Sequence, residues 1–217
     1  PIASTIPPST ATTGVPKLPI KSFPKCFLAK PKLRLFPKSE QWLYPYPAAI
    51  GEKAFYGCEN LRAIVLPAGL NEISRNAFEN CTALKDVTFS KDIYCISELA
   101  FSNTGITDVV ISSNDYCYIF EAAFKGCKEL ESVRLENGVE YVGMNAFLDC
   151  PKLKTIYLSK SVSSFEDNAF NGCDNVTFEL VKNSKAYKYI KDYTDFNFEV
   201  VEELSFFERI IEFFRSL

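Results

Sequence analysis

The chain has 217 residues, of which 47% are hydrophobic and 24% are charged, and its net charge is −3 at pH 7. A charge this small gives no indication of a nucleic-acid partner. The chain contains no histidine, which excludes Cys–His and Ser–His–Asp catalysis and histidine-ligated metal. We therefore expect no enzyme activity and no cofactor. No apolar run of about 18 residues occurs, so no transmembrane helix is expected.

The N-terminal part differs in composition from the rest of the chain. Residues 1–25 are rich in proline, serine and threonine, which is typical of an extended linker. Residues 1–39 contain no acidic residue, and their cationic residues are Lys17, Lys21, Lys25, Lys30, Lys32, Arg34 and Lys38. This basic segment is either a solvated linker or an arm that contacts an anionic surface. Residues 26–49 contain large apolar side chains and are predicted to cap the first repeat.

The identity of the first residue indicates whether the chain is the direct product of translation. The chain starts with Pro1 rather than methionine, and its one methionine is Met144. We therefore expect a fragment or a processed product from which any signal peptide has been removed.

A repeat of 23 residues occupies residues 50–181. Starting at Ile50, the unit reads I-x-x-x-A-F-x-x-C-x-x-L-x-x-V-x-L. Further copies begin at Ile73, Ile96, Ile119, Val142 and Phe165. The third copy has Thr104 in place of cysteine and loses one residue within "SNTGIT". Copies in one register predict a stack of identical units, each too small to form a core by itself.

The two halves of the unit predict different local structures. The half L-x-x-V-x-L ends in two-residue alternation, which is typical of a short strand with Val and Leu facing inward. The half that carries Ile, Ala, Phe and Cys predicts a turn or a short helix that covers the same interior. A small alanine beside each phenylalanine leaves room for the ring of the adjacent coil.

The stretch "IGEKAFYGCENLRAIVLP" at residues 50–67 and its copies resemble the BspA-like class of leucine-rich repeats. This class occurs in bacterial cell-surface proteins and in some protist proteins. The resemblance covers about residues 50–200 and includes "NSKAYKYIKDYTDFNFEVV", which is similar to the helix-plus-strand segment that closes such arrays; residues 182–202 would form this C-terminal cap. It implies an α/β repeat solenoid, a right-handed leucine-rich-repeat superhelix of about six 23-residue coils with a parallel sheet on one face.

Residues 203–217 predict an amphipathic C-terminal helix. Ser205 and Glu208 form a capping box at its start. The helix is too short to span a bilayer, and its balanced charges disfavour membrane contact. Packing on the solenoid or on another chain is favoured, followed by self-association through Phe206, Phe207, Ile210, Ile211 and Phe214.

The cysteines allow two interpretations. Those of the repeat are Cys58, Cys81, Cys127, Cys150 and Cys173. A metal-binding row is conceivable, but their apolar surroundings favour buried free thiols that act as small hydrophobic side chains. Cys95 and Cys117 lie outside this register, and a disulfide between them is left open.

The outward positions of the predicted strands form the candidate binding face. They are Ala63, Val65, Asp86, Thr88, Asp108, Val110, Ser132, Arg134, Thr155 and Tyr157. Arginine and tyrosine are frequent anchors of protein interfaces, so Arg134 and Tyr157 are the preferred candidates. The alternative is a solvated sheet surface without a partner.

The functional interpretation follows from the resemblance and from the absence of catalytic motifs. We expect a non-enzymatic, secreted or cell-surface protein that binds a protein or a glycan, with adhesion as one role. The alternative is an architectural spacer that projects another domain. A fold does not fix a partner, so the ligand stays unspecified.

Overall fold

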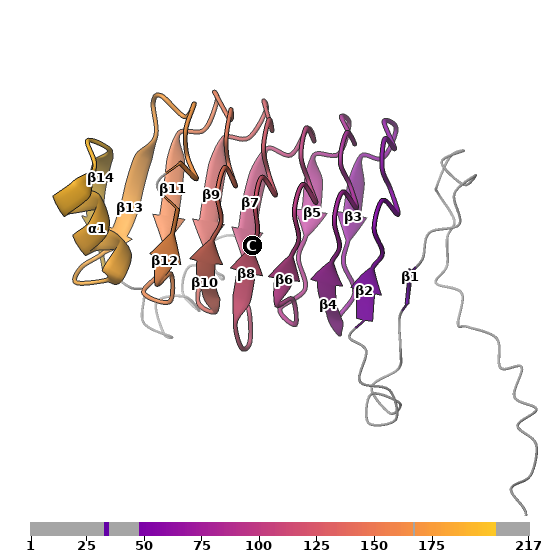
Figure 1. Ribbon diagram of the computed structural model, residues 1–217, viewed down its shortest axis with the longest axis horizontal. Helices are drawn as coiled ribbons and strands as arrows, with labels where there is room; N and C mark the ends of the chain where they lie inside the picture. Colours follow the sequence, from indigo (N-terminus) through magenta and orange to yellow (C-terminus); the bar gives the residue numbers. More distant parts are fainter. Residues whose placement is uncertain (1–32, 35–47, 167, 203–217) are drawn as a thin grey trace, which may run out of the picture.

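The computed structural model describes residues 33–34, 48–166 and 168–202, and Figure 1 shows these residues as a row of stacked turns. The predicted repeat solenoid is confirmed, with little helix and with about seven turns of about 23 residues rather than the expected six or so. The strands are β1 (Leu33–Arg34), β2 (Ala48–Ile50), β3 (Ala63–Val65), β4 (Leu70–Ile73), β5 (Asp86–Thr88), β6 (Cys95–Ile96), β7 (Asp108–Ile111), β8 (Cys117–Ile119), β9 (Ser132–Leu135), β10 (Val139–Val142), β11 (Thr155–Leu158), β12 (Ser164–Phe165), β13 (Thr177–Val181) and β14 (Asn197–Val201). The helix α1 spans Lys185–Tyr193.

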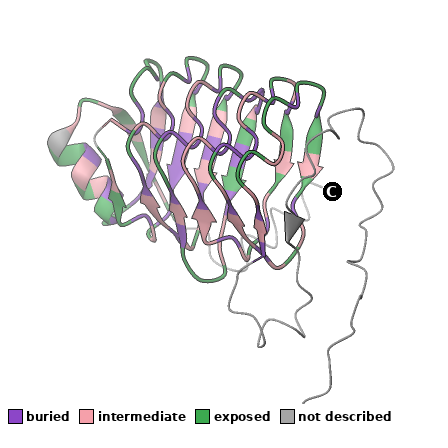
Figure 2. Ribbon diagram, turned by 45° about the vertical axis from the view of Figure 1, so that its right-hand side comes forward, coloured by how far each residue is buried: buried purple, intermediate pink, exposed green. Residues whose placement is uncertain are grey.

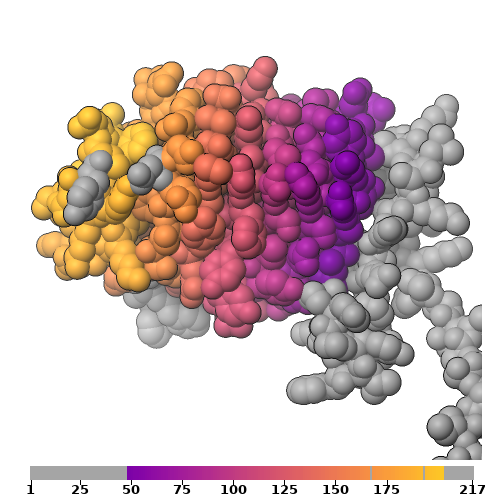
Figure 3. Space-filling model, viewed as in Figure 1, coloured from indigo at the N-terminus to yellow at the C-terminus, as the bar shows by residue number. Residues whose placement is uncertain are grey.

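Each turn contributes one strand to each of two faces. The first sheet has the order β1-β2-β4-β6-β8-β10-β12, and the second sheet has the order β14-β13-β11-β9-β7. Strands β3 and β5 pair with each other in a separate two-stranded sheet. All pairs are parallel except β1 with β2. Figure 3 shows the turns lying side by side in sequence order in one elongated body.

The first sheet adds strands that the repeat pattern does not predict. The pattern places a turn or a short helix opposite the predicted strand, and turns are found after Ile73 and Ile96. The residues just before these isoleucines, however, are extended and pair in parallel, as Glu72 does with Cys95. In β4 the end residues Leu70 and Ile73 are buried and the residues between them are half-buried, and in β6 the half-buried Cys95 precedes the buried Ile96. The parallel sheet therefore occurs on both faces rather than on one.

A ladder of phenylalanine rings runs through the centre of the solenoid. The repeat residues Phe55, Phe78, Phe101, Phe124, Phe147 and Phe170 stack one above the next, with ring centroids 4.9–5.6 Å apart and planes within 7° of parallel. The rings from Phe78 to Phe147 are completely buried. Because one ring covers the next, each turn completes the core of its neighbour, as the repeat pattern predicts.

The alanine before each phenylalanine brings the backbones of adjacent turns close together. The amide of Phe78 donates to the carbonyl oxygen of Ala100 at 2.8 Å, and the amide of Phe101 donates to that of Ala123 at 2.7 Å. Ala100 and Ala123 are completely buried. A larger side chain at these positions would separate the turns and break this row of hydrogen bonds.

Left-handed backbone torsions recur at two fixed places in the turns. One set has φ between 54° and 57° and comprises Lys53, Asn76, Leu99, Ala122 and Asn145. The other set has φ between 55° and 73° and comprises Gly57, Asn80, Asn103, Gly126, Asp149 and Gly172. Glycine, asparagine and aspartate tolerate this region best, which explains why they dominate the second set.

The C-terminal end of the array is covered by α1 and β14. Ser184 caps α1 by accepting a hydrogen bond from the amide of Tyr187 at 2.9 Å. Strand β14 pairs with β13 over five residue pairs. The predicted linker at 1–25, most of the predicted cap at 26–49 and the predicted helix at 203–217 lie outside the described residues, so self-association through that helix stays a prediction.

Candidate binding faces

The predicted row of outward residues is divided between the β3–β5 sheet and the second sheet. Figure 2 shows buried, half-buried and exposed segments along the strands, with exposed residues on β3 and β5. Val65 in β3 is 75% exposed and Val110 in β7 is 48% exposed. Ala63, Asp86, Thr88 and Asp108 are also exposed, whereas Ser132, Arg134 and Thr155 are half-buried. The first half of the row is thus open to solvent.

The second half of the row is occupied by contacts within the chain. The Arg134 guanidinium carbon lies 4.4 Å from the ring centroid of Tyr157. The same guanidinium lies 3.7 Å from a carboxylate oxygen of Glu136 and 3.7 Å from one of Glu179. Ser132 donates a hydrogen bond to Asp108 at 2.5 Å. The side chains that were expected to contact a partner therefore contact other side chains of the same chain.

Tyr157 differs from its predicted exposure. It lies on β11 in register with Arg134 on β9, but it is only 6% exposed. The guanidinium of Arg134 lies over the ring, so a partner reaches Tyr157 only after Arg134 has moved. Of the two preferred anchors, Arg134 remains accessible on this face.

The outer face of the first sheet carries an aromatic cluster that the sequence interpretation missed. We call Tyr94, Tyr116, Tyr118, Phe120 and Tyr141 the tyrosine face. Ring centroids are 5.5 Å apart for Tyr116 and Tyr118, and 6.4 Å apart for Tyr118 and Tyr141. Tyr116 is 40% exposed and Phe120 is 42% exposed. Aromatic side chains gathered at a surface are typical of interfaces.

Carboxylates surround the tyrosine face. The hydroxyl group of Tyr118 donates to Glu140 at 3.4 Å, and that of Tyr141 donates to Glu166 at 3.1 Å. Partial burial, followed by these negative charges, raises the pKa of three tyrosines. The carboxylates that contribute are Glu72 for Tyr94, Glu140 for Tyr118, and Glu166 with Glu121 for Tyr141. The tyrosine face therefore combines aromatic rings with nearby carboxylates, and Lys91 lines a pocket together with Tyr94 and Tyr116.

A signal for the tyrosine face was present in the sequence. The residues before the isoleucine that starts each copy differ from copy to copy, so they do not belong to the repeat pattern. In the third, fourth and fifth copies those residues include Tyr94, Tyr118 and Tyr141. Alternation of Tyr118 and Tyr141 with buried Ile119 and Val142 would have indicated a strand with aromatic residues on its outer side.

The repeat cysteines are buried, as expected, and Cys127, Cys150 and Cys173 are free thiols. The thiol of Cys127 donates to the carbonyl oxygen of Phe101 at 3.3 Å, and that of Cys173 donates to the carbonyl oxygen of Phe147 at 3.3 Å. Thr104 takes the place of the cysteine in the third copy, but its hydroxyl group donates to the carbonyl oxygen of Phe101 in its own copy, at 2.9 Å. Cys95 and Cys117 are both free thiols, so the bridge that was left open is not formed.

Stability at high pH is expected to depend on the buried thiols. Burial raises the pKa of Cys117 from 9.0 to about 12 and that of Cys127 to about 11. An acid whose pKa is raised by folding stabilises fully below pH 9 and loses this contribution as the pH rises toward its folded pKa. Between pH 9 and 12, the free energy of unfolding should therefore fall more steeply with pH in wild type than in the Cys117→Ala variant. The expected difference in slope is about 1.4 kcal/mol per pH unit.

Urea unfolding of wild type and Cys117→Ala at a series of pH values measures this difference. The slopes are compared, because the substitution also leaves a small cavity that lowers stability at every pH. Equal slopes for the two proteins would show that Cys117 does not titrate differently in the folded and unfolded states.

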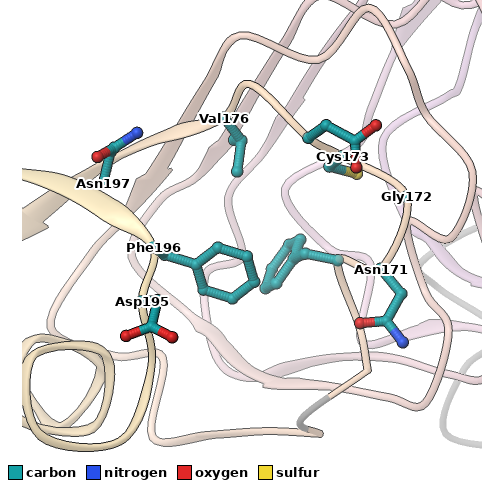
Figure 4. A pocket seen from close by; sticks show the side chains of 9 residues that line it. Asn171, Gly172, Cys173, Val176, Asp195, Phe196 and Asn197 are labelled. Atoms are coloured by element: carbon teal, nitrogen blue, oxygen red, sulfur yellow. The ribbon is translucent and has the colours of Figure 1, made fainter.

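A pocket of about 270 Å³ lies where the phenylalanine ladder ends. Phe170 meets Phe178 edge-on with centroids 5.1 Å apart, and Phe178 contacts Phe196 at 5.1 Å. Figure 4 shows the ring of Phe196 pointing into the pocket, while Asp195 and Asn197 point away from it. At this end of the ladder, Phe178 and Phe196 cover Phe170 in the place where another repeat would stack its phenylalanine ring. We therefore interpret this pocket as part of the C-terminal cap.

Two further properties concern the described ranges 33–34, 48–166 and 168–202. Their helix α1 has nine residues, and no helix in these ranges is long and apolar enough to cross a membrane. No group of three metal-ligating side chains in these ranges is placed to hold a metal ion.

Parallel strands on stacked turns, with an internal ladder of repeat residues, define a leucine-rich-repeat solenoid. The chain belongs to the family of the BspA type leucine-rich repeat region, whose repeat matches in six copies over residues 48–177. No curated protein matches the sequence.

Solved structures show the same fold. A leucine-rich repeat protein of T. pallidum (TpLRR) is 25% identical and has a TM-score of 0.58; the match covers 71% of this chain and 80% of that one. The pneumococcal vaccine antigen PcpA is 18% identical and has a TM-score of 0.57; the match covers 72% of this chain and 39% of that one. This chain therefore spans about two fifths of the length of the pneumococcal protein.

Proposed function

We propose that this chain is the binding part of a secreted or cell-surface protein that recognises a protein or a glycan, with adhesion as one role. Membership of the BspA-type family supports this proposal. The chain acts as a rigid scaffold, and the side chains on the outer faces of its strands select the partner. The proposal treats the chain as non-enzymatic, because it has no histidine to serve as a general base.

One observation carries the proposal for the predicted row. Val110 on β7 and Arg134 on β9 are direct partners in the strand register, and the Tyr157 ring on β11 lies under Arg134. Sheets hold such a row at a spacing of about 4.8 Å per strand, which gives a surface that needs no ordering before it binds. The exposed valines Val65 and Val110 supply apolar area. Arg134 supplies the charge.

Binding to a panel of immobilised extracellular proteins and glycans tests this function. We expect wild type to bind a member of the panel, and Val110→Glu and Arg134→Gln to weaken that binding at least about ten-fold, or about 1.4 kcal/mol. Lys128→Glu is the control, because Lys128 is exposed on a connection outside the strands. Unfolding curves establish that each variant is folded.

The architectural spacer is the alternative outcome of the same experiment. A spacer presents no ligand site, so wild type would bind no member of the panel. Binding that both row variants retain in full would instead remove this row as the site.

A further inference from the structure

We propose that the tyrosine face is a docking site for an extended, lysine- or arginine-bearing segment of a partner protein. This site lies on the first sheet, whereas the row of the proposed function lies on the β3–β5 sheet and the second sheet. The two proposals therefore depend on different residues and can fail separately.

The tyrosine face offers a continuous aromatic surface across three neighbouring strands and their ends. The rings form an unbroken series of contacts, from Tyr94 to Tyr116 at 6.2 Å and on through Tyr118 to Tyr141. Tyr118 and Tyr141 are direct partners in the pairing of β8 with β10. Their neighbours Ile119 and Val142 are completely buried, so the tyrosines lie on the opposite, outer side.

Among the described residues, the carboxylates of this face form no ion pair. The five ion pairs within 48–166 and 168–202 join other residues, so within these ranges no lysine or arginine nitrogen lies within 4.0 Å of Glu72, Glu121, Glu140 or Glu166. Two of these carboxylates, Glu140 and Glu166, are held beside the rings by tyrosine hydroxyl groups. Negative charge is thus fixed at the edges of an electron-rich aromatic surface.

The second sheet shows which group suits such a surface. There, the Arg134 guanidinium lies 4.4 Å from the Tyr157 ring centroid and is flanked by Glu136 and Glu179. The tyrosine face repeats the ring and the flanking carboxylates without the cation, with Tyr118 beside Glu140 and Tyr141 beside Glu166. A cation from a partner would complete the same arrangement, through attraction to both the ring and the carboxylate.

The spacing of the rings matches an extended peptide. Side chains on one side of an extended strand repeat every two residues, or about 6.6 Å. The ring centroids of Tyr118 and Tyr141 are 6.4 Å apart, and those of Tyr94 and Tyr116 are 6.2 Å apart. A peptide that crosses the strands can therefore place alternate cationic side chains over successive rings.

Charge complementarity favours this occupant over the other classes. A nucleic acid or an anionic glycan would be repelled by the four glutamates. A neutral glycan can stack on the rings and donate hydroxyl hydrogen bonds to the carboxylates, but it brings no positive charge to neutralise them. A cationic peptide uses both features of the site.

The test measures binding of three probes to the full chain by fluorescence polarisation at low and physiological salt. The first probe is a nonapeptide of alternating lysine and threonine, the second has glutamate in place of each lysine, and the third is a neutral glucose hexasaccharide. We expect wild type to bind the lysine peptide, more tightly at low salt, and to bind neither other probe.

Two variants locate the binding. Glu140→Gln/Glu166→Gln keeps the acceptors for both tyrosine hydroxyl groups but removes the charge, and Tyr118→Leu removes one ring. Each should weaken binding of the lysine peptide at least about ten-fold. The control Glu59→Gln/Glu202→Gln changes net charge equally at exposed residues near the two ends of the array, and should bind within about two-fold of wild type.

Several results would overturn the inference. They are no binding of the lysine peptide, preferential binding of the hexasaccharide, or equal weakening in the control, which would indicate attraction by net charge alone. Val110→Glu separates this inference from the proposed function, because it lies on the second sheet and should leave binding of the lysine peptide unchanged.

Discussion

Replacing Phe124 with alanine is expected to lower the free energy of unfolding by about 3–5 kcal/mol, which is the cost typical of emptying a buried aromatic site. The ring of Phe124 is completely buried and stacks on Phe101 and Phe147, each at a centroid distance of 5.2 Å. Its loss removes contacts from both neighbouring turns, so the interface on each side is weakened. Urea unfolding followed by circular dichroism measures the change.

Phe120→Ala is the matched control for this substitution. Phe120 lies four residues earlier in the same turn, but it is 42% exposed and outside the ladder. It should cost less than about 1 kcal/mol, as surface substitutions usually do. A similar cost at the two positions would contradict the claim that stacking through the ladder stabilises the solenoid.

Replacing Gly138 with alanine is expected to lower the free energy of unfolding by about 3 kcal/mol. Gly138 has a φ of +93°, which disfavours any residue with a Cβ atom. An added Cβ would also overlap the backbone carbonyl group of Ser113 in the preceding turn. Because backbone cannot move aside as a flexible side chain does, the two turns would have to separate.

Gly69→Ala distinguishes the two contributions. Gly69 has a φ of +82°, but an added Cβ would meet no atom within 4 Å. Only the conformational cost applies there, so we expect a loss of about 1 kcal/mol. The difference between the two variants in urea unfolding isolates the overlap between turns; equal losses would show that Gly138 is needed for its torsion alone.

The core of the fold could be predicted from the sequence. Phe78, Phe101 and Phe124 recur every 23 residues, and an identical environment every turn follows directly from that spacing. The inward residues of the predicted strands, such as Val109 and Val133, are buried for the same reason. Periodicity predicts such buried positions well, because each copy packs the same side chains against the same neighbours.

The candidate site was harder to predict, because it depends on how side chains on different strands meet. Tyr157 was predicted to be exposed, yet it is buried because Arg134 from the neighbouring strand lies over it. Arg134 is held there partly by Glu179, which lies on β13 in the shortened sixth copy. No feature of a single repeat specifies this contact, since it requires the register of three strands.

The tyrosine face was missed for a different reason. Its tyrosines occur in some copies of the repeat and not in others, so they do not contribute to the period that identified the fold. In the register of the first sheet, Tyr118 and Tyr141 occupy the position that holds Glu72 and Cys95 in earlier turns. Residues that vary between copies at an exposed strand position are free to serve a partner, because packing does not fix them.

Hydroxyl-radical footprinting of the full chain, with and without the lysine–threonine nonapeptide, tests most directly the claim that strand faces rather than turns form a binding surface. We predict reduced oxidation at Tyr116, Tyr118 and Phe120. Tyr56 and Met144, which are exposed on turns, should be oxidised equally in both samples. Protection of Tyr56 or Met144 without protection of Tyr118 would contradict the account.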